Sequence, residues 1–160
     1  MTGTKKSALE YAAGLLGVRM YSAAELRKKL YAQEYPAAEI RQVIEDFVRK
    51  GYLNDALYAE NLCSAMTARG DGKRKIAGKL RAKGIDPELI GTVLQTLDGE
   101  IPEEEAAWQS LRKKKLQLMR EADERRQKEK IVRYLAGHGF SASAAFSAWE
   151  RFRREMSGKE

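Results

Sequence analysis

Apolar residues recur along this chain with the spacing of amphipathic helices. The segment from Ile40 to Phe47 carries apolar side chains at positions i, i+3, i+4 and i+7, which places them on one helical face. Leu26 and Leu30 stand four residues apart and share a face in the same way. No stretch shows the sustained alternation of polar and apolar residues that is typical of a half-buried strand. The pattern therefore predicts an all-α fold.

A set of seven apolar positions occurs three times with the same internal spacing. The first set shifts by 50 residues to give the second, and by a further 55 residues to give the third. Three matching sets predict three equivalent structural units, in which Leu30, Leu80 and Leu135 occupy equivalent core positions. The sets are Leu26, Leu30, Tyr35, Ile40, Val43, Ile44 and Phe47; Ile76, Leu80, Ile85, Ile90, Val93, Leu94 and Leu97; and Ile131, Leu135, Phe140, Ala145, Ala148, Trp149 and Phe152.

Helix breakers and capping residues fall at matching places in this repeat. Gly84 and Gly139 stand where a helix would end in a left-handed residue. Asp86 and Ser141 follow as N-caps of the next helix, whereas the first set has Tyr35-Pro36 at this place and no glycine. Ser22 and Glu25 have the spacing of a capping box, and a turn near Asp123 precedes the middle helix of the third set.

One further helix precedes each repeated pair, so the predicted unit has three helices. These additional helices cover about residues 7–17, about residues 54–68, and a segment from about residue 103. We expect three tandem three-helix, helix-turn-helix-like repeats over residues 1–53, 54–101 and 102–160, in an elongated arrangement. The faces expected to pack are Leu9, Ala12, Ala13 and Leu16; Tyr58, Ala59 and Leu62; and Ala106, Ala107 and Leu111. Tyr52 is also expected to be a core aromatic.

Composition agrees with a helical protein and excludes several kinds of site. Hydrophobic residues make up 43% of the 160 positions and charged residues 33%, with only 3 prolines, which argues against disorder. The single cysteine, Cys63, leaves no internal disulfide and no thiolate zinc cluster. No apolar run is long enough to span a membrane, and none resembles a signal peptide. We expect a cytoplasmic monomer that holds no metal or cofactor and binds no membrane.

The residues that might perform catalysis have structural interpretations, so we expect a protein that is not an enzyme. His138 is the only histidine available as a base, and its place at a predicted helix end favours a capping role. Cys63 lies among small and apolar residues, as a core thiol does. The acidic run 103–105 follows a proline at a predicted helix start, where acidic side chains stabilise the helix dipole.

The net charge of +7 is distributed unevenly. Residues 69–84 carry seven basic side chains against Asp71 alone, and residues 108–135 carry ten basic against four acidic. The segment between them, 85–107, has seven acidic side chains and no basic one. The two basic segments are either solvated helix faces or a surface for a polyanion or an acidic protein.

Tandem helical units of this kind also raise the possibility of DNA recognition. In a helix-turn-helix protein, the second helix carries base-reading side chains near its start. The helix after Asp86 has no basic residue through Thr96, and the helix after Ser141 begins with small residues and Phe146. The sequence therefore disfavours specific recognition, whereas non-specific phosphate contact by the basic helices stays open.

The segment Gly51-Tyr52-Leu53-Asn54-Asp55 followed by Tyr58-Ala59, together with Gly139-Phe140-Ser141 near the end of the repeat, resembles the RecX family of bacterial regulatory proteins. The resemblance covers residues 8–152 and implies a tandem three-helix fold. It further implies a negative regulator of the RecA recombinase that binds the RecA filament on single-stranded DNA and suppresses its ATP hydrolysis, strand exchange and co-protease activity. The acidic stretch 100–105 departs from the family pattern. The matching residues are Arg19, Ser22, Glu25, Leu26, Leu30, Gly51-Tyr52-Leu53-Asn54-Asp55, Tyr58-Ala59, Gly72, Ile76, Leu80, Gly84, Ile85, Tyr134-Leu135 and Gly139-Phe140-Ser141.

The two basic segments are the candidate surface for such a filament, which presents phosphate and acidic protein along a groove. An independent helical protein that binds DNA non-specifically is the alternative that the same residues support. The candidate contact residues are Lys73, Arg74, Lys75, Arg81 and Lys83 in the second unit, with Arg125, Arg126, Lys128 and Arg133 in the third.

Overall fold

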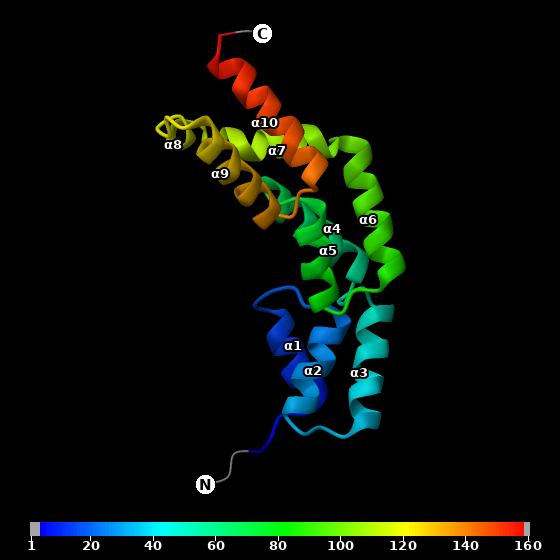
Figure 1. Ribbon diagram of the computed structural model, residues 1–160. Coiled ribbons are helices and arrows are strands. Elements are labelled where there is room, and N and C mark those ends of the chain that lie inside the picture. The colour runs from blue at the N-terminus through cyan, green and yellow to red at the C-terminus, as the bar shows by residue number, and fades with distance from the viewer. Residues whose placement is uncertain (1–3, 159–160) are drawn as a thin grey trace.

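The computed structural model describes residues 4–158, and this part of the chain folds into ten helices with no strand (Figure 1). The all-α prediction is confirmed. No helix in the described range is both long and apolar enough to span a membrane. The helices are α1 (Ala8–Leu16), α2 (Ala23–Ala32), α3 (Ala37–Arg49), α4 (Asp55–Ala68), α5 (Lys73–Ala82), α6 (Pro87–Glu100), α7 (Glu103–Arg112), α8 (Lys115–Leu118), α9 (Glu124–Gly137) and α10 (Ala142–Met156).

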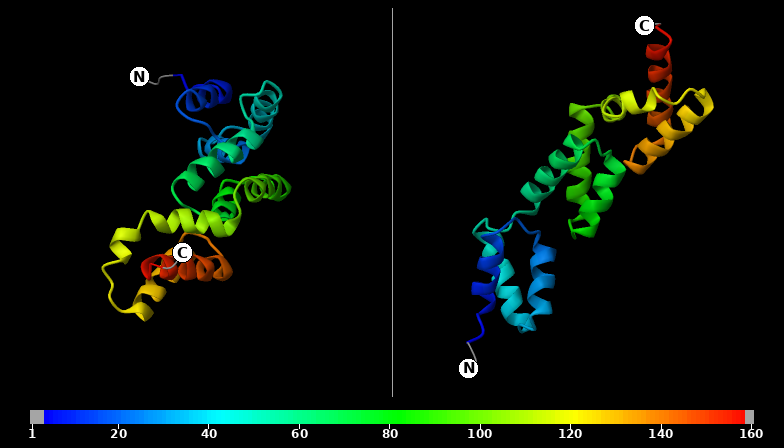
Figure 2. Two further views of the ribbon diagram at one scale, coloured as in Figure 1. Left: turned by 90° about the horizontal axis from the view of Figure 1, so that it is seen from above. Right: turned by 90° about the vertical axis from the view of Figure 1, so that its left-hand side faces the viewer.

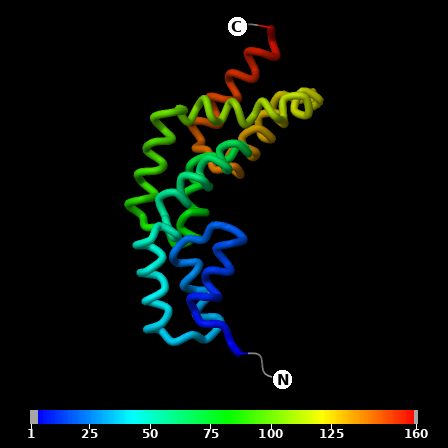
Figure 3. The backbone as a smooth tube through the Cα atoms, turned by 180° about the vertical axis from the view of Figure 1, so that it is seen from behind, coloured from blue at the N-terminus to red at the C-terminus, as the bar shows by residue number. Residues whose placement is uncertain are grey.

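The helices form three units, each with its own hydrophobic core. Unit one (α1–α3) buries a cluster around Leu26 and Leu30, and unit two (α4–α6) buries one around Ile76 and Leu80. Unit three (α7–α10) has the third cluster, which includes Trp149. The units follow one another in a curved, elongated array, with α1 near one end and α10 at the other (Figures 2 and 3). A small core in each unit leaves the contacts between neighbours to determine the arrangement.

The repeated apolar positions have the burial that the sequence predicts. Leu30, Leu80 and Leu135 all have 0% exposure. Every other member of the three sets is buried except Leu94 and Leu97, which pack against the second core from its edge and are partly buried. The spacing of apolar residues alone was thus sufficient to locate all three cores.

The predicted caps are also present. Ser22 and Glu25 form both halves of a capping box, and the Asp86 and Ser141 side chains accept hydrogen bonds from the first turns of α6 and α10. Gly139 closes α9 with a φ of +89°. Unit one has no glycine at this place, and Glu34 adopts the left-handed conformation instead, with a φ of +63°. A residue with a Cβ pays about 1–2 kcal/mol for that conformation.

Three details differ from the sequence-based expectations. Helix α1 packs through Ala8 and Ala12, whereas Leu9 and Ala13, which were expected to pack, are exposed, because the small side chains of Ala8 and Ala12 allow close helix packing. Tyr52 is 64% exposed, although its ring lies edge-on to Phe47 with centroids 5.6 Å apart. The short helix α8, between α7 and α9, was not predicted, since four residues are too few to show a helical period.

The middle helices of the three units, α9, α5 and α2, meet end to end. Between units two and three, the backbone N–H of Gly72 donates to the carbonyl of His138 over 2.6 Å, and that of Arg74 donates to Gly139 over 3.2 Å. Between units one and two, the Ser22 hydroxyl donates to the carbonyl of Lys83 over 2.6 Å. Donors at the start of α5 thus pair with carbonyls at the end of α9, and a donor at the start of α2 pairs with a carbonyl at the end of α5. The positive dipole end of one helix faces the negative dipole end of the other, and the two ends attract.

These two joints are equivalent in the sequence repeat. Ser22 and Gly72 are 50 residues apart, and both are N-caps of a middle helix. Lys83 and His138 are 55 residues apart, and both are C-caps of a middle helix. The repeat in the sequence therefore extends from the cores to the contacts between units.

We predict that truncation of the equivalent leucines destabilises the protein by similar amounts. Leu30→Ala, Leu80→Ala and Leu135→Ala each remove a fully buried side chain, so each lowers the free energy of unfolding of its unit by about 2–5 kcal/mol. Urea denaturation measures the change. Val18→Ala is the control, because Val18 is 85% exposed and its loss changes stability by no more than about 0.5 kcal/mol. A neutral result at two of the three leucines contradicts the repeat.

A second prediction concerns the joint between units two and three. Gly139→Ala places a Cβ 2.5 Å from the backbone nitrogen of Lys75 and forces a left-handed φ on alanine, so it lowers the free energy of unfolding by at least about 1–2 kcal/mol. Gly137→Ala is the matched control two residues earlier, where no atom lies within 4 Å of the new Cβ. Thermal unfolding of both variants tests the joint, and equal stability of the two contradicts it.

Candidate functional site

Three of the candidate cations of unit two form ion pairs with carboxylates of the protein. Lys73 pairs with Asp98 over 3.0 Å, and Lys75 pairs with Asp71 over 3.1 Å. Lys83 pairs with Glu25 of unit one over 3.3 Å. Their charges are partly neutralised by these carboxylates, so they are less available to an external partner.

Other candidates are exposed and unneutralised. Among the described residues, the guanidinium groups of Arg74, Arg81, Arg126 and Arg133 have no carboxylate partner, and all four side chains are exposed. Lys128 lies over the ring of Phe146, with its Nζ 5.2 Å from the centroid. These side chains carry positive charge into solvent, where long-range attraction to an anion is strongest at low salt.

Part of the basic surface of α9 is concave. Arg125, Lys128 and Arg133 line a shallow depression together with Glu129, Val132 and Ala136. Arg125 also lies 3.6 Å from Glu129, in a pair exposed enough to contribute little. The structure thus brings three of the four unit-three candidates to one surface and leaves Arg126 outside it.

The basic faces of α5 and α9 are equivalent in the repeat. Arg74 and Arg81 lie on either side of Gly78 along one face of α5, and Gly78 corresponds to Arg133 in the 55-residue shift. Because α9 and α5 meet end to end, these exposed cations follow one another along the array. Their arrangement suits an extended polyanion or acidic surface and offers no enclosed pocket for a small molecule.

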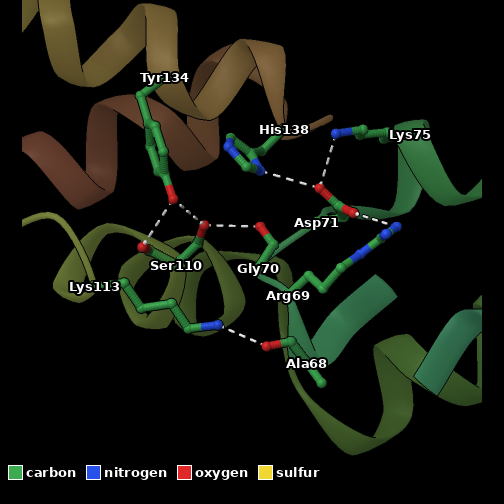
Figure 4. A network of polar contacts seen from close by, with 9 residues as sticks. All are labelled: Ala68, Arg69, Gly70, Asp71, Lys75, Ser110, Lys113, Tyr134 and His138. Carbon is green, nitrogen blue, oxygen red and sulfur yellow. Dashed lines mark hydrogen bonds and ion pairs between the residues drawn. The ribbon is translucent and has the colours of Figure 1, made fainter. Parts of the chain in front are cut away.

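A polar network fastens units two and three beside this surface (Figure 4). The Asp71 carboxylate, whose side chain is 3% exposed, contacts Arg69 at 3.3 Å, Lys75 at 3.1 Å and the Nδ1 of His138 at 3.0 Å. The Ser110 hydroxyl donates to the carbonyl of Gly70 over 2.7 Å. His138 occupies the helix-end position that the sequence predicts, and its ring adds a contact to Asp71.

Burial of Asp71 and the contacts with its polar partners shift the pKa of its carboxyl in opposite directions. Burial alone would raise the pKa of this carboxyl, but hydrogen bonds from Lys75 and His138, with the charges of Lys75 and Arg69, lower the pKa below its usual value. The carboxylate is therefore ionised at neutral pH and stabilises the joint. The sequence signal for this role was that Asp71 is the sole acid among seven basic residues.

The acidic run of α7 has a larger structural role than dipole matching. Glu103 accepts a short hydrogen bond from the Ser141 hydroxyl, and Glu105 pairs with Arg151 over 3.0 Å. Glu104 lies 3.4 Å from the Ser147 hydroxyl. All three partners belong to α10 or its cap, so this run fastens α7 to α10 within unit three.

The remaining reactive group is also part of the core. Cys63 is buried, and burial raises the pKa of its thiol, which disfavours the thiolate. The described residues contain no group of three or more histidine, cysteine, aspartate or glutamate side chains arranged to hold a metal ion.

The joint network leads to a prediction about pH. Because the pKa of Asp71 is lowered in the folded protein, its contribution to stability is present above the unfolded value of about 4 and is lost as pH falls through the folded pKa. Asp71→Asn therefore lowers the free energy of unfolding by about 1–3 kcal/mol at pH 7. Urea denaturation shows the gap between parent and variant narrowing from pH 7 to pH 3. An equal gap at both pH values contradicts the assignment.

Known proteins share both the domains and the fold of this chain. Residues 8–47 match the model of the first three-helix domain of RecX, and residues 54–94 match that of the second. Regulatory protein RecX of Trichlorobacter lovleyi is 32% identical over 155 residues, which cover 94% of this chain and 100% of that protein. Regulatory protein RecX of Thermus thermophilus is 34% identical over 151 residues, which cover 94% and 96%.

Solved structures agree with these matches. The crystal structure of RecX from Lactobacillus salivarius superposes with a TM-score of 0.78 at 20% identity, covering 91% of this chain and 94% of that one, and supports the fold. A crystal structure of a regulatory protein RecX gives a TM-score of 0.74 at 25% identity, covering 91% and 71%. Since the domain matches span half of the sequence and the relatives align over nearly all of it, this chain belongs to the RecX family of regulatory proteins.

Proposed function

We propose that this protein regulates RecA by binding the RecA filament on single-stranded DNA, and that binding suppresses ATP hydrolysis, strand exchange and co-protease activity. The observation that carries the proposal is the succession of exposed cations along α9 and α5 in a chain of the RecX family. A nucleoprotein filament presents phosphate and acidic protein surface along its length. An elongated array can contact several of its subunits at once.

Regulation by binding agrees with how the reactive side chains are used. His138 contacts Asp71 at a joint, Cys63 is buried in a core, and Glu103 is bonded to Ser141. These three groups, a candidate base, a candidate nucleophile and a candidate acid, are thus each held in a structural contact. The exposed charges, in contrast, are available to set the association rate and its salt dependence.

Independent, non-specific DNA binding is the second candidate, because the same exposed cations suit bare phosphates. The two functions differ in whether inhibition of RecA requires the protein to bind naked DNA. A RecA regulator inhibits single-stranded-DNA-dependent ATP hydrolysis by RecA at concentrations that leave naked DNA unbound. A protein that acts through DNA alone inhibits only where it already covers the strand.

We predict that reversing the charge of the basic residues in the α9 depression weakens inhibition of RecA. The variant Arg125→Glu, Lys128→Glu and Arg133→Glu changes three exposed charges on one surface, so it inhibits RecA ATP hydrolysis less and loses much of the salt dependence of the parent. Titration against RecA at about 50 mM and 200 mM salt measures both effects. The fold is preserved, because all three side chains are exposed and their contacts, of Arg125 with Glu129 and of Lys128 with Phe146, lie at the surface.

The control variant reverses the charge of three basic residues elsewhere in unit three. Arg112, Lys114 and Arg120 are exposed and have no ion pair among the described residues, so their reversal gives the same change in net charge. Reversal of Glu103–Glu105 is unsuitable, because these residues fasten α7 to α10. If the depression variant inhibits like the parent at both salt concentrations, the α9 cations are only a solvated face.

A further inference from the structure

A second basic concavity lies between units one and two. One wall is α2, with Lys28 and Lys29, and the other is the end of α5, with Arg81 and Lys83. The candidate residues drawn from the charge distribution included Arg81 and Lys83 but no residue of α2. The charge distribution does not indicate Lys28, because the first unit is nearly neutral. In the repeat, however, Lys28 is equivalent to Gly78 and therefore to Arg133.

The cleft carries positive charge that the described residues do not neutralise. Lys28, Lys29 and Arg81 are exposed, and none has a carboxylate partner in the part of the chain that the structure describes. Glu25 is the only acid in the lining, and its carboxylate already contacts Lys83 at 3.3 Å and accepts from the backbone N–H of Ser22 at 3.0 Å. Three unpaired cations on two facing walls favour an anion between them.

The floor of the cleft consists of small residues. Ala24, Ala32, Ala82 and Gly84 line it, and a Cβ on Gly84 would collide with the side chain of Ala24. No aromatic or amide side chain lines the cleft. Protein partners are usually anchored by aromatic or long apolar side chains in fitted pockets, and this floor offers no such pocket. A chain recognised through its charged backbone fits the lining better than a folded protein surface.

An exposed aromatic side chain lies on α2 beside the residues that line the cleft. Tyr31 is 52% exposed and belongs to none of the three cores. It follows Lys28, which lines the cleft, by three residues on α2, so the two side chains are neighbours on one side of the helix. Helical side chains lean towards the helix N-terminus, which for Tyr31 is the direction of Lys28. A basic groove beside an exposed aromatic ring is the combination that binds single strands, in which phosphates meet cations and a base stacks on the ring.

We propose that this cleft binds the phosphate backbone of single-stranded nucleic acid, with one base stacked on Tyr31. The site is distinct from the α9 depression and extends the basic surface of the array into unit one. It binds any base sequence, because the lining contains no amide that could read base edges. It prefers single strands to duplex, whose bases are not available to the tyrosine.

The first test removes the cleft cations from the full-length protein. The variant Lys28→Gln, Lys29→Gln and Arg81→Gln is compared with a control, Lys6→Gln, Arg41→Gln and Lys50→Gln, which removes three exposed cations of unit one away from the cleft and from Tyr31. Fluorescence anisotropy follows binding of a labelled 20-nucleotide oligothymidylate between about 50 and 200 mM salt. Equal unfolding midpoints in urea establish that both variants are folded.

The cleft variant binds at least about tenfold more weakly at the lower salt, and its slope of log K against log salt is shallower by about 2, since each lost phosphate contact on a single strand contributes about 0.7. The control changes affinity by no more than about twofold. Equal losses in the two variants overturn the proposal, because then only the net charge matters.

The second test addresses the tyrosine. Tyr31→Ala weakens oligothymidylate binding at least about fivefold, Tyr31→Phe binds like the parent, and neither changes binding of a 20-base-pair duplex, since stacking needs the ring and an unpaired base. Equal loss for single strand and duplex, or no loss in Tyr31→Ala, overturns the stacking assignment. If polyglutamate displaces the oligonucleotide as well as unlabelled oligothymidylate does, the cleft is an acidic-protein site and the proposal is wrong. No RecA is present, so failure here is distinct from failure of RecA inhibition.

Discussion

The arrangement of this protein depends on hydrogen bonds between the end of one middle helix and the start of the next. Helix ends leave carbonyls unpaired and helix starts leave N–H groups unpaired. Here the carbonyls of His138 and Gly139 accept from Gly72 and Arg74, and the carbonyl of Lys83 accepts from Ser22. Since each unit has only a small core, these joints align the units along the array.

The joints also determine how the exposed positive charges are arranged along the surface. Some cations of α5 and α9 serve the fold, such as Lys75 beside Asp71 and Lys83 beside Glu25. Others face solvent and have no carboxylate partner within residues 4–158, such as Arg81 and Arg133. Because equivalent faces succeed one another through the end-to-end contacts, the exposed charges form an extended surface, which suits a long polyanionic partner better than a compact ligand.

The sequence predicted the units because the relevant interactions are local. Helical periodicity located the cores, and short-range caps such as that of Ser22 located helix starts. It did not predict the pairing of Asp71 with His138, which are 67 residues apart, or that Lys28 shares a cleft with Arg81. It also misjudged α1, where hydrophobicity favoured Leu9 although the close contact uses Ala8 and Ala12. Contacts made by backbone carbonyls or by alanines are difficult to predict from a single sequence, because every residue has a carbonyl and alanine occurs on buried and exposed faces alike.

Amide hydrogen exchange at the first turn of α5 tests the end-to-end joint most directly. Arg74 and Glu104 are both the second residue of a helix, α5 and α7, and such amides have no partner within their own helix. The Arg74 amide donates to Gly139, whereas that of Glu104 has no hydrogen-bond partner among the described residues. We predict that Arg74 exchanges at least about 100-fold more slowly than Glu104, because exchange requires the joint to open. Equal exchange of the two amides would show that the middle helices are not joined.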